Sequence, residues 1–79
     1  MEVRYDPEAD AIDVKLRDWR GPLKSRPLDD RRIVDFDEEG NVVGVEFLFV
    51  SEGIHLEGVP EADRVRKLLQ SLSKLTPVG

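Results

Sequence analysis

The chain has 79 residues and a net charge of −5, with no cysteine and a single histidine. A chain this short forms one domain, over residues 1–79, and its cysteine and histidine content excludes disulfides and Cys/His zinc sites. The acidic balance argues against a general nucleic-acid binder.

Nothing in the sequence predicts a membrane or export segment. The start of the chain is charged and lacks the apolar stretch of a signal peptide, and no apolar run approaches the roughly 20 residues of a membrane span. We therefore expect a cytoplasmic protein with no membrane contact. Charged residues make up 37% of the chain, and such richness in charge is typical of heat-adapted proteins.

The first elements in chain order are two short strands, because apolar and polar side chains alternate with a period of two. If residues 7–10 form a hairpin loop, one face pairs apolar residues: Tyr5 with Ile12, Val3 with Val14 and Met1 with Leu16. The other face pairs opposite charges: Arg4 with Asp13 and Glu2 with Lys15. Such pairs contribute ~0.2–1 kcal/mol each. A slip of one residue would mix the faces, so the sequence predicts this register.

The loop itself is rich in carboxylates. Asp6, Glu8 and Asp10 have the alternate spacing that opens a calcium-binding loop, but such a loop needs glycine at its sixth position and glutamate at its twelfth. Those positions hold Ala11 and Arg17. We therefore interpret the stretch as a turn in which Asp6 accepts hydrogen bonds while Glu8 and Asp10 are solvated.

The segment that follows predicts a turn and then a short edge strand at residues 23–28, since it contains Pro27 and proline is confined to sheet edges. Basic residues surround the only tryptophan here, and Trp and Arg are favoured interface anchors. Four residues are therefore candidates for a partner interface: Trp19, Arg17, Arg20 and Arg26. The alternative is a solvated loop with Trp19 folded back onto the sheet or helix.

Residues 31–50 predict a second hairpin. Asp37 to Gly40 has the pattern of a type I turn whose glycine is left-handed, and this glycine permits a bulge that leaves the register open. The second strand, Val42 to Val50, is apolar on both faces, as in a strand covered twice. One face holds Val43, Val45, Phe47 and Phe49, and the other holds Val42, Leu48 and Val50.

A C-terminal helix is predicted over residues 60–75, because proline is favoured at the first helical position and apolar residues then follow at helical spacing. The apolar stripe consists of Ala62, Val65, Leu68, Leu69, Leu72 and Leu75. Acidic Glu61 and Asp63 in the first turn and Lys74 in the last suit the helix dipole.

These elements predict an α+β fold: a small antiparallel β-sheet built from two hairpins plus short edge strands, with a C-terminal α-helix packed on one face of the β-rich part, residues 1–58. One helix covers only one face of such a sheet. The other face then needs a second copy of the chain or a small partner protein, so we expect a homodimer or a hetero-complex.

Two stretches, VRYDPEADAIDVKL and RIVDFDEEGNVVGVEFL, together resemble the small prokaryotic proteins of the family named domain of unknown function 2283 (DUF2283). Its members read as a Y-D-x-E-x-D-A-hydrophobic hairpin followed by a V-D-x-D-x-x-G-x-V-V-G-x-E hairpin. The resemblance runs from Val3 to about Leu48. It implies a compact β-rich domain without an established activity, and, because some members sit beside small toxin-like proteins, an antitoxin-like role is one option.

One group of acidic residues is a candidate for binding a metal or small ligand. Asp35, Asp37 and Glu46 approach one another across the second hairpin, as weak candidates for binding a divalent metal or small ligand. The alternative is structural pairing, with Arg31 and Arg32 as the partners.

We find no catalytic constellation. His55 has no nucleophile or orienting group that the sequence places beside it, so we expect a packing or surface histidine, no enzyme and no cofactor. The leading hypothesis is a non-enzymatic protein-interaction module. The alternative is a small-ligand or divalent-metal binding domain that uses the second-hairpin carboxylates.

Overall fold

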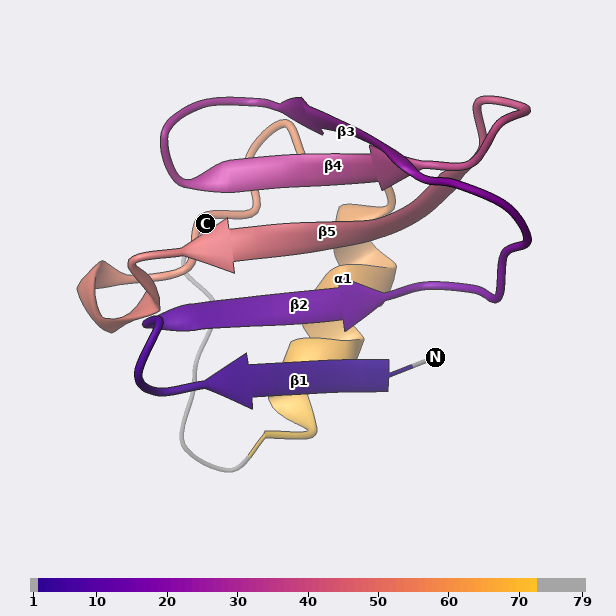
Figure 1. Ribbon diagram of the computed structural model, residues 1–79. Helices are drawn as coiled ribbons and strands as arrows, with labels where there is room; N and C mark the ends of the chain where they lie inside the picture. The colour runs from indigo at the N-terminus through magenta and orange to yellow at the C-terminus, as the bar shows by residue number, and fades with distance from the viewer. Residues whose placement is uncertain (1, 73–79) are drawn as a thin grey trace.

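The computed structural model describes residues 2–72 and confirms the α+β fold. One antiparallel sheet has the strand order β1-β2-β5-β4-β3 (Figure 1). Its strands are β1 Glu2–Asp6, β2 Ala11–Lys15, β3 Lys24–Pro27, β4 Arg32–Phe36 and β5 Val42–Leu48. The predicted edge strand is β3, and β5 lies in the middle of the sheet.

The first hairpin has the predicted register. Val3 lies opposite Val14 and Arg4 opposite Asp13, while the predicted pairing of Met1 lies outside the described residues. In the turn, Asp6 Oδ1 accepts hydrogen bonds from the Glu8 and Ala9 amides at 3.0 and 3.2 Å, as predicted.

Asp10 is not simply solvated as expected. Its φ is +54°, and its carboxylate accepts hydrogen bonds from the Ser51 amide and hydroxyl at 2.9 and 2.7 Å. The Val50 amide also donates to the Asp10 carbonyl at 3.0 Å. The first turn therefore anchors the short 3₁₀ helix η1, Val50–Glu52, that follows β5.

The second hairpin contains the predicted turn and a bulge. The Gly40 amide donates to the Asp37 carbonyl at 3.1 Å, and Gly40 has a φ of +87°. Asp35 pairs with Gly44 whereas Phe36 pairs with Val42, so one residue of β5, Val43, has no partner in β4. Such a bulge changes which face the neighbouring side chains occupy.

The predicted placement of Val42, Phe49 and Val50 on the two faces of this strand is therefore wrong. Because of the bulge, Val42 packs against the same core cluster as Val45. The strand ends at Leu48; Phe49 is left-handed and 48% exposed, and Val50 reaches the core from η1.

Helix α1 spans Ala62–Gln70, and so begins later and ends earlier than the sequence predicts. Glu61 has a left-handed φ of +54° and precedes the helix, and its carbonyl accepts hydrogen bonds from the Arg64 and Val65 amides. Its carboxylate accepts two hydrogen bonds from the Arg17 guanidinium at 2.8 Å, which ties α1 to the end of β2. Lys74 and Leu75 lie outside the described residues.

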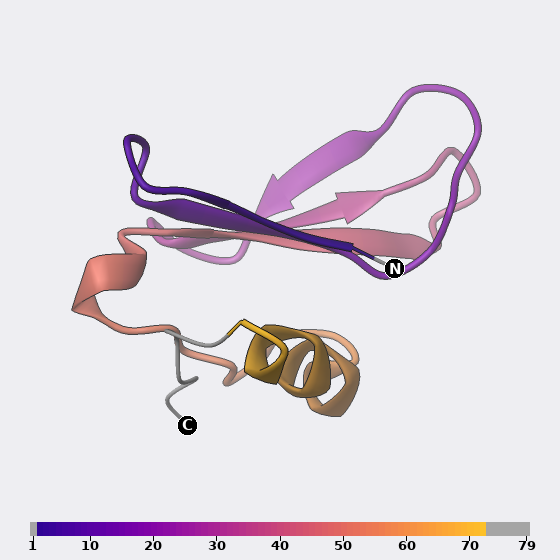
Figure 2. The same ribbon diagram turned by 90° about the horizontal axis from the view of Figure 1, so that it is seen from below.

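The hydrophobic core lies between the sheet and α1 (Figure 2). Each fully buried side chain of this kind stabilises the fold by about 1.5–3 kcal/mol. The cluster comprises Ile12, Val14, Leu16, Val45, Phe47, Val50, Ile54, Leu56, Val59, Val65 and Leu69. No helix of the described residues covers the other face of the sheet, which is called the open face below. Within residues 2–72, no helix has the length and apolarity to cross a membrane.

Strands β2 and β5 approach so closely at Gly44 that a side chain does not fit there. A Cβ atom on Gly44 would lie 2.4 Å from the Val14 carbonyl oxygen. Backbone atoms of a central strand move only with the strand pairing itself, so the contact cannot be relieved by a side-chain rotation.

Gly44→Ala is therefore expected to lower the free energy of unfolding by about 1–3 kcal/mol, the usual cost of overpacking. Urea denaturation checks this. An alanine in an unobstructed strand stabilises by roughly 0.5–1 kcal/mol relative to glycine, and a gain of that kind in the variant would contradict the close approach.

Candidate functional site

The open face carries a group of carboxylates in the middle of the sheet, one from each of three neighbouring strands. Asp13 comes from β2, Glu46 from β5 and Asp35 from β4. They share this face because side chains alternate along a strand and directly opposed residues point the same way. We call these three residues the carboxylate cluster.

The strand register explains how the cluster forms. Asp13 lies directly opposite Glu46 across β2 and β5. Asp35 lies opposite Gly44, one step diagonally from Glu46, and the two carboxyl groups share a hydrogen bond. The Ser25 hydroxyl of β3 donates to Asp35 Oδ1 at 2.6 Å. Asp35 is only 7% exposed, so it is a buried acidic group. Its two hydrogen-bonding neighbours, Ser25 and Glu46, both belong to strands of the sheet.

Crowding of like charges perturbs the acidity of the cluster. Partial burial, the hydrogen bond to Asp35 and then the negative charges of Asp35 and Asp13 raise the pKa of Glu46 to about 7. Loss of solvation and the Asp35 charge also raise the pKa of Asp13, against the opposing effect of Lys15 and Arg4. A proton on Glu46 relieves the repulsion by bonding to Asp35.

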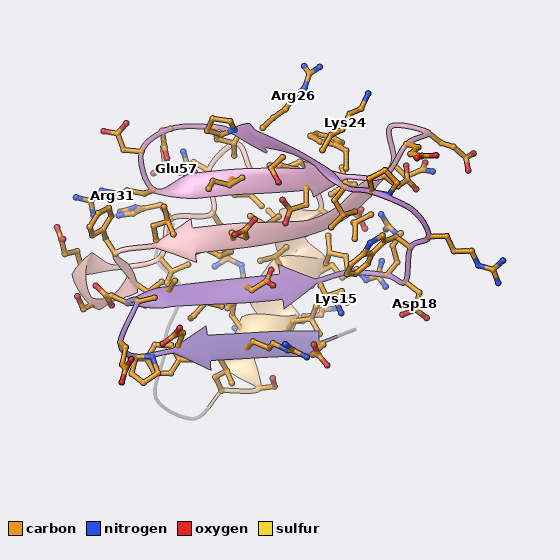
Figure 3. The ribbon with its side chains drawn as sticks, viewed as in Figure 1. Lys15, Asp18, Lys24, Arg26, Arg31 and Glu57 are labelled. Carbon is orange, nitrogen blue, oxygen red and sulfur yellow. The ribbon has the colours of Figure 1, made fainter. Side chains whose placement is uncertain are left out.

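The basic side chains beside the cluster are engaged with other groups. Arg4 Nε lies 2.8 Å from Glu2 Oε2, and Lys15 Nζ lies 3.8 Å from the same oxygen. Lys15 also stands over the Trp19 ring, 4.6 Å from its centre, near the end of β2 (Figure 3). Within the described residues neither of them forms an ion pair with the cluster, although both positive charges act to lower the pKa of Asp13.

Trp19 flanks a small hollow in the open face. The hollow measures about 40 Å³, and its lining includes Asp13, Asp35, Trp19 and Leu23. Ligand pockets are usually 300–1,000 Å³, whereas a single water needs roughly 10–15 Å³ by a comparable measure. The hollow suits a few waters or the tip of one side chain, and is too small for an ordinary substrate.

Comparison of the sequence with known protein families gives one match. The sequence profile of the family described as "Protein of unknown function (DUF2283)" matches residues 2–51, more than half of the chain. The chain belongs to the DUF2283 family. The matched span contains all five strands, so the carboxylate cluster lies inside the DUF2283 domain and α1 lies beyond the match. Comparison with curated proteins and with solved structures yields no significant match.

The structure brings together two of the three residues predicted as weak metal candidates. Asp35 and Glu46 meet in the cluster, but Asp37 lies in the hairpin turn, where its carboxylate accepts bonds from Asn41 and the Glu39 amide. These bonds lower the pKa of Asp37. No group of three or more metal-ligating side chains with suitable placement occurs within residues 2–72.

Asp13 is the cluster residue that sequence reasoning missed. The sequence correctly places it opposite Arg4, and that pairing is present. Glu46 becomes its second neighbour through the long-range pairing of β2 with β5. The sequence offers only one signal for that pairing, namely that both strands are apolar enough to lie in the middle of the sheet.

Arg31 and Arg32, expected as partners of the acidic residues of the second hairpin, pair elsewhere. Arg31 lies 3.0 Å from Glu52, and Arg32 lies 2.7 Å from Asp29 and also donates to the carbonyls of His55 and Glu57. Asp35 is held by a hydroxyl group instead. Arg32 lies opposite the core residue Phe47, on the other face of β4 from Asp35.

His55 is half-buried, with its Nδ1 atom 3.7 Å from Glu57 Oε1. Its neighbours Ile54 and Leu56 are buried in the core, so its position agrees with a packing role.

The four predicted interface residues do not form one surface. Arg17 is bound to Glu61 and to the Val42 carbonyl. Trp19 is half-buried on the open face, Arg20 is exposed in the loop, and Arg26 points away from the edge strand β3 (Figure 3). Their contact with a partner stays a prediction, with Trp19 the best placed beside the carboxylate cluster.

The raised pKa of Glu46 predicts how stability depends on pH. The folded state keeps the proton up to about pH 7, whereas the unfolded chain releases it near 4.5. The stability that this proton provides is fully present below pH 4.5 and is lost as the pH rises through 7. The free energy of unfolding should therefore fall across this window.

Glu46→Gln, which mimics the neutral acid, should remove most of that fall and make the domain more stable than wild type at pH 8. Chemical denaturation at a series of pH values measures this. Glu39→Gln, at an exposed turn residue, is the matched control and should keep the wild-type slope. A Glu46→Gln profile parallel to wild type would contradict the crowding of the cluster.

Proposed function

We propose that this DUF2283 domain is a non-enzymatic protein-interaction module whose open face receives a lysine side chain of a partner protein. The observation that supports this most directly is the carboxylate cluster, which is held together against its own repulsion on a face that no described helix covers. Groups that lower stability in this way are retained more often for function than for folding.

The surroundings of the cluster favour a cationic side chain over other ligands. The small hollow beside Asp13 and Asp35 is bordered by the Trp19 ring and by Lys15, whose ammonium group already stands over that ring. A cation from a partner is therefore held by the carboxylates rather than by the ring. A lysine brings a compact ammonium group on a long apolar stem, which fits a shallow surface hollow. A folded partner or a peptide segment supplies such a residue without needing an enclosed pocket.

A cationic partner suits this face better than a second copy of the chain centred on the cluster. If the two-fold axis of a dimer passed through the cluster, Asp13, Asp35 and Glu46 would face the same three carboxylates, and like charges across an interface are unfavourable. Other placements of two open faces avoid this contact, so a second copy on this face stays a prediction. An antitoxin-like role is one form of the proposal, in which the partner is a toxin that presents the lysine.

A lysine-containing synthetic peptide, with valines between its lysines, tests the proposal. Calorimetry should show binding to the wild-type domain, and amide chemical-shift changes should centre on Asp13, Asp35 and Glu46. Glu46→Gln should weaken binding about tenfold or more, since a charged hydrogen bond contributes roughly 1.5–3 kcal/mol. Lowering the pH from above to below 7 should weaken it in the same direction, because Glu46 then holds a proton.

The control is Glu39→Gln, which removes the same charge from an exposed turn. Equal weakening by both substitutions would reveal only general attraction to an acidic protein, and would contradict the proposal. Shift changes that centre on the turn at residues 37–40 would do the same.

A further inference from the structure

Strand β1 has a free edge whose hydrogen-bonding groups follow from the ladder. The Leu16 amide donates to the Val43 carbonyl at 2.7 Å, so Leu16, and residues two and four before it, bond to β5. The alternate residues of β2 therefore bond to β1, and their partners are Glu2, Arg4 and Asp6. The amide and carbonyl groups of Val3 and Tyr5 consequently point outward, away from the sheet.

The other edge of the sheet is less suited to pairing. The Leu28 amide donates to the Arg32 carbonyl at 2.7 Å, so on β3 the outward residues are Ser25 and Pro27. Pro27 has no amide hydrogen, and Lys24 and Arg26 extend from this edge into solvent (Figure 3). A proline on an edge strand removes a backbone donor and is one device by which edge strands avoid other chains. Strand β1 contains no proline and is one residue longer.

We propose that a second copy of this chain pairs antiparallel with β1, with Val3 opposite Val3, and joins two five-stranded sheets into one continuous sheet. In a two-fold pairing, the outward-pointing amide and carbonyl groups of one β1 strand must bond to those of the other. Three registers allow this: Val3 opposite Val3, Val3 opposite Tyr5, and Tyr5 opposite Tyr5 of the second copy. The side chains on the open face, Glu2, Arg4 and Asp6, decide among these registers.

Charge separates the registers. With Val3 opposite Tyr5, Arg4 faces Arg4 and Glu2 faces Asp6, which opposes like charges at every position. With Tyr5 opposite Tyr5, Arg4 faces Asp6, but Val3 faces Pro7, which has no amide to donate. With Val3 opposite Val3, Glu2 of each copy faces Arg4 of the other. Opposed unlike charges stabilise an antiparallel pair and like charges destabilise it.

The helix side of the same edge supplies apolar surface. Val3 is half-buried, and the half-buried Leu68 and Leu72 of the C-terminal segment also pack against the core cluster. Tyr5 lies opposite Ile12 on this side and is 48% exposed. Figure 1 shows α1 crossing behind β1 toward this edge. Pairing with Val3 opposite Val3 would bring the apolar strips of the two copies together beneath the joined strands.

Amide exchange of the unaltered full chain gives the first test. The Val3 and Tyr5 amides should exchange slowly at near-millimolar protein and rapidly after dilution to low micromolar, because dissociation returns them to solvent. The Ser25 amide, which points outward on β3, is the internal control and should exchange rapidly at both concentrations. Rates for Val3 and Tyr5 that do not change with concentration would overturn the proposal.

Charge reversal gives the second test, with mass measured by light scattering or sedimentation. Arg4→Glu should weaken dimerisation by about tenfold or more, because both symmetry-related pairs become repulsive. Glu2→Arg and Arg4→Glu together should restore it, although this double change worsens the pairing with Lys15 and Asp13 within one chain. Arg4 and Glu2 also pair within one chain at 2.8 Å, so the recovery supports the proposal only where the stability of the monomer, measured at low micromolar concentration, does not recover in parallel.

Arg26→Glu is the matched control, since it makes the same change in charge at the edge strand β3 and should leave the dimer intact. A wild-type chain that is monomeric at near-millimolar concentration, or a double variant that stays as weak as Arg4→Glu, would overturn the proposal. The β1 edge and the open face are different surfaces, so failure of this pairing leaves the proposed lysine binding unaffected, and the peptide experiment judges that separately.

Discussion

The structure depends on one row of valines across four strands. Val3, Val14, Val45 and Val34 lie opposite one another from β1 to β4, and this row sets which way every other side chain of those strands points. A shift of one residue in any pair would exchange the two faces. The row therefore places the core side chains of the sheet against α1. As a direct consequence, Asp13, Glu46 and Asp35 lie on the opposite face.

The strand register thus places the three carboxylates close together, which lowers the stability of the fold. Local hydrogen bonds reduce this loss. The Ser25 hydroxyl and a shared proton satisfy Asp35 and Glu46, and the raised pKa of Glu46 reflects its burial, its hydrogen bond to Asp35 and the remaining repulsion. A neutral residue such as glutamine in place of one acid would remove that repulsion. The presence of three acids on one uncovered face is the physical reason to assign the open face to a cationic partner.

Sequence reasoning succeeded where local pairing decides the structure and failed where distant contacts do. The first hairpin register followed from charge pairs and alternation, and the turn at Asp37–Gly40 from its glycine. The bulge at Val43 moved Val42 onto the core face, and only the partner strand reveals such a bulge. Glu46 lies on the open face by the ordinary alternation of the strand. The helix start at Ala62 likewise depends on Arg17, 44 residues from Glu61.

The central claim is that the register crowds three carboxylates on the open face, and the ionisation of Glu46 tests it most directly. Carbon-detected NMR of the labelled side-chain carboxyl group follows this one residue through a pH titration. The account predicts a midpoint near 7 for Glu46, moving toward the ordinary value when Asp35→Asn removes the neighbouring charge. A wild-type midpoint near 4.5, the ordinary value for glutamate, would show that the carboxylates are not crowded and would contradict the account.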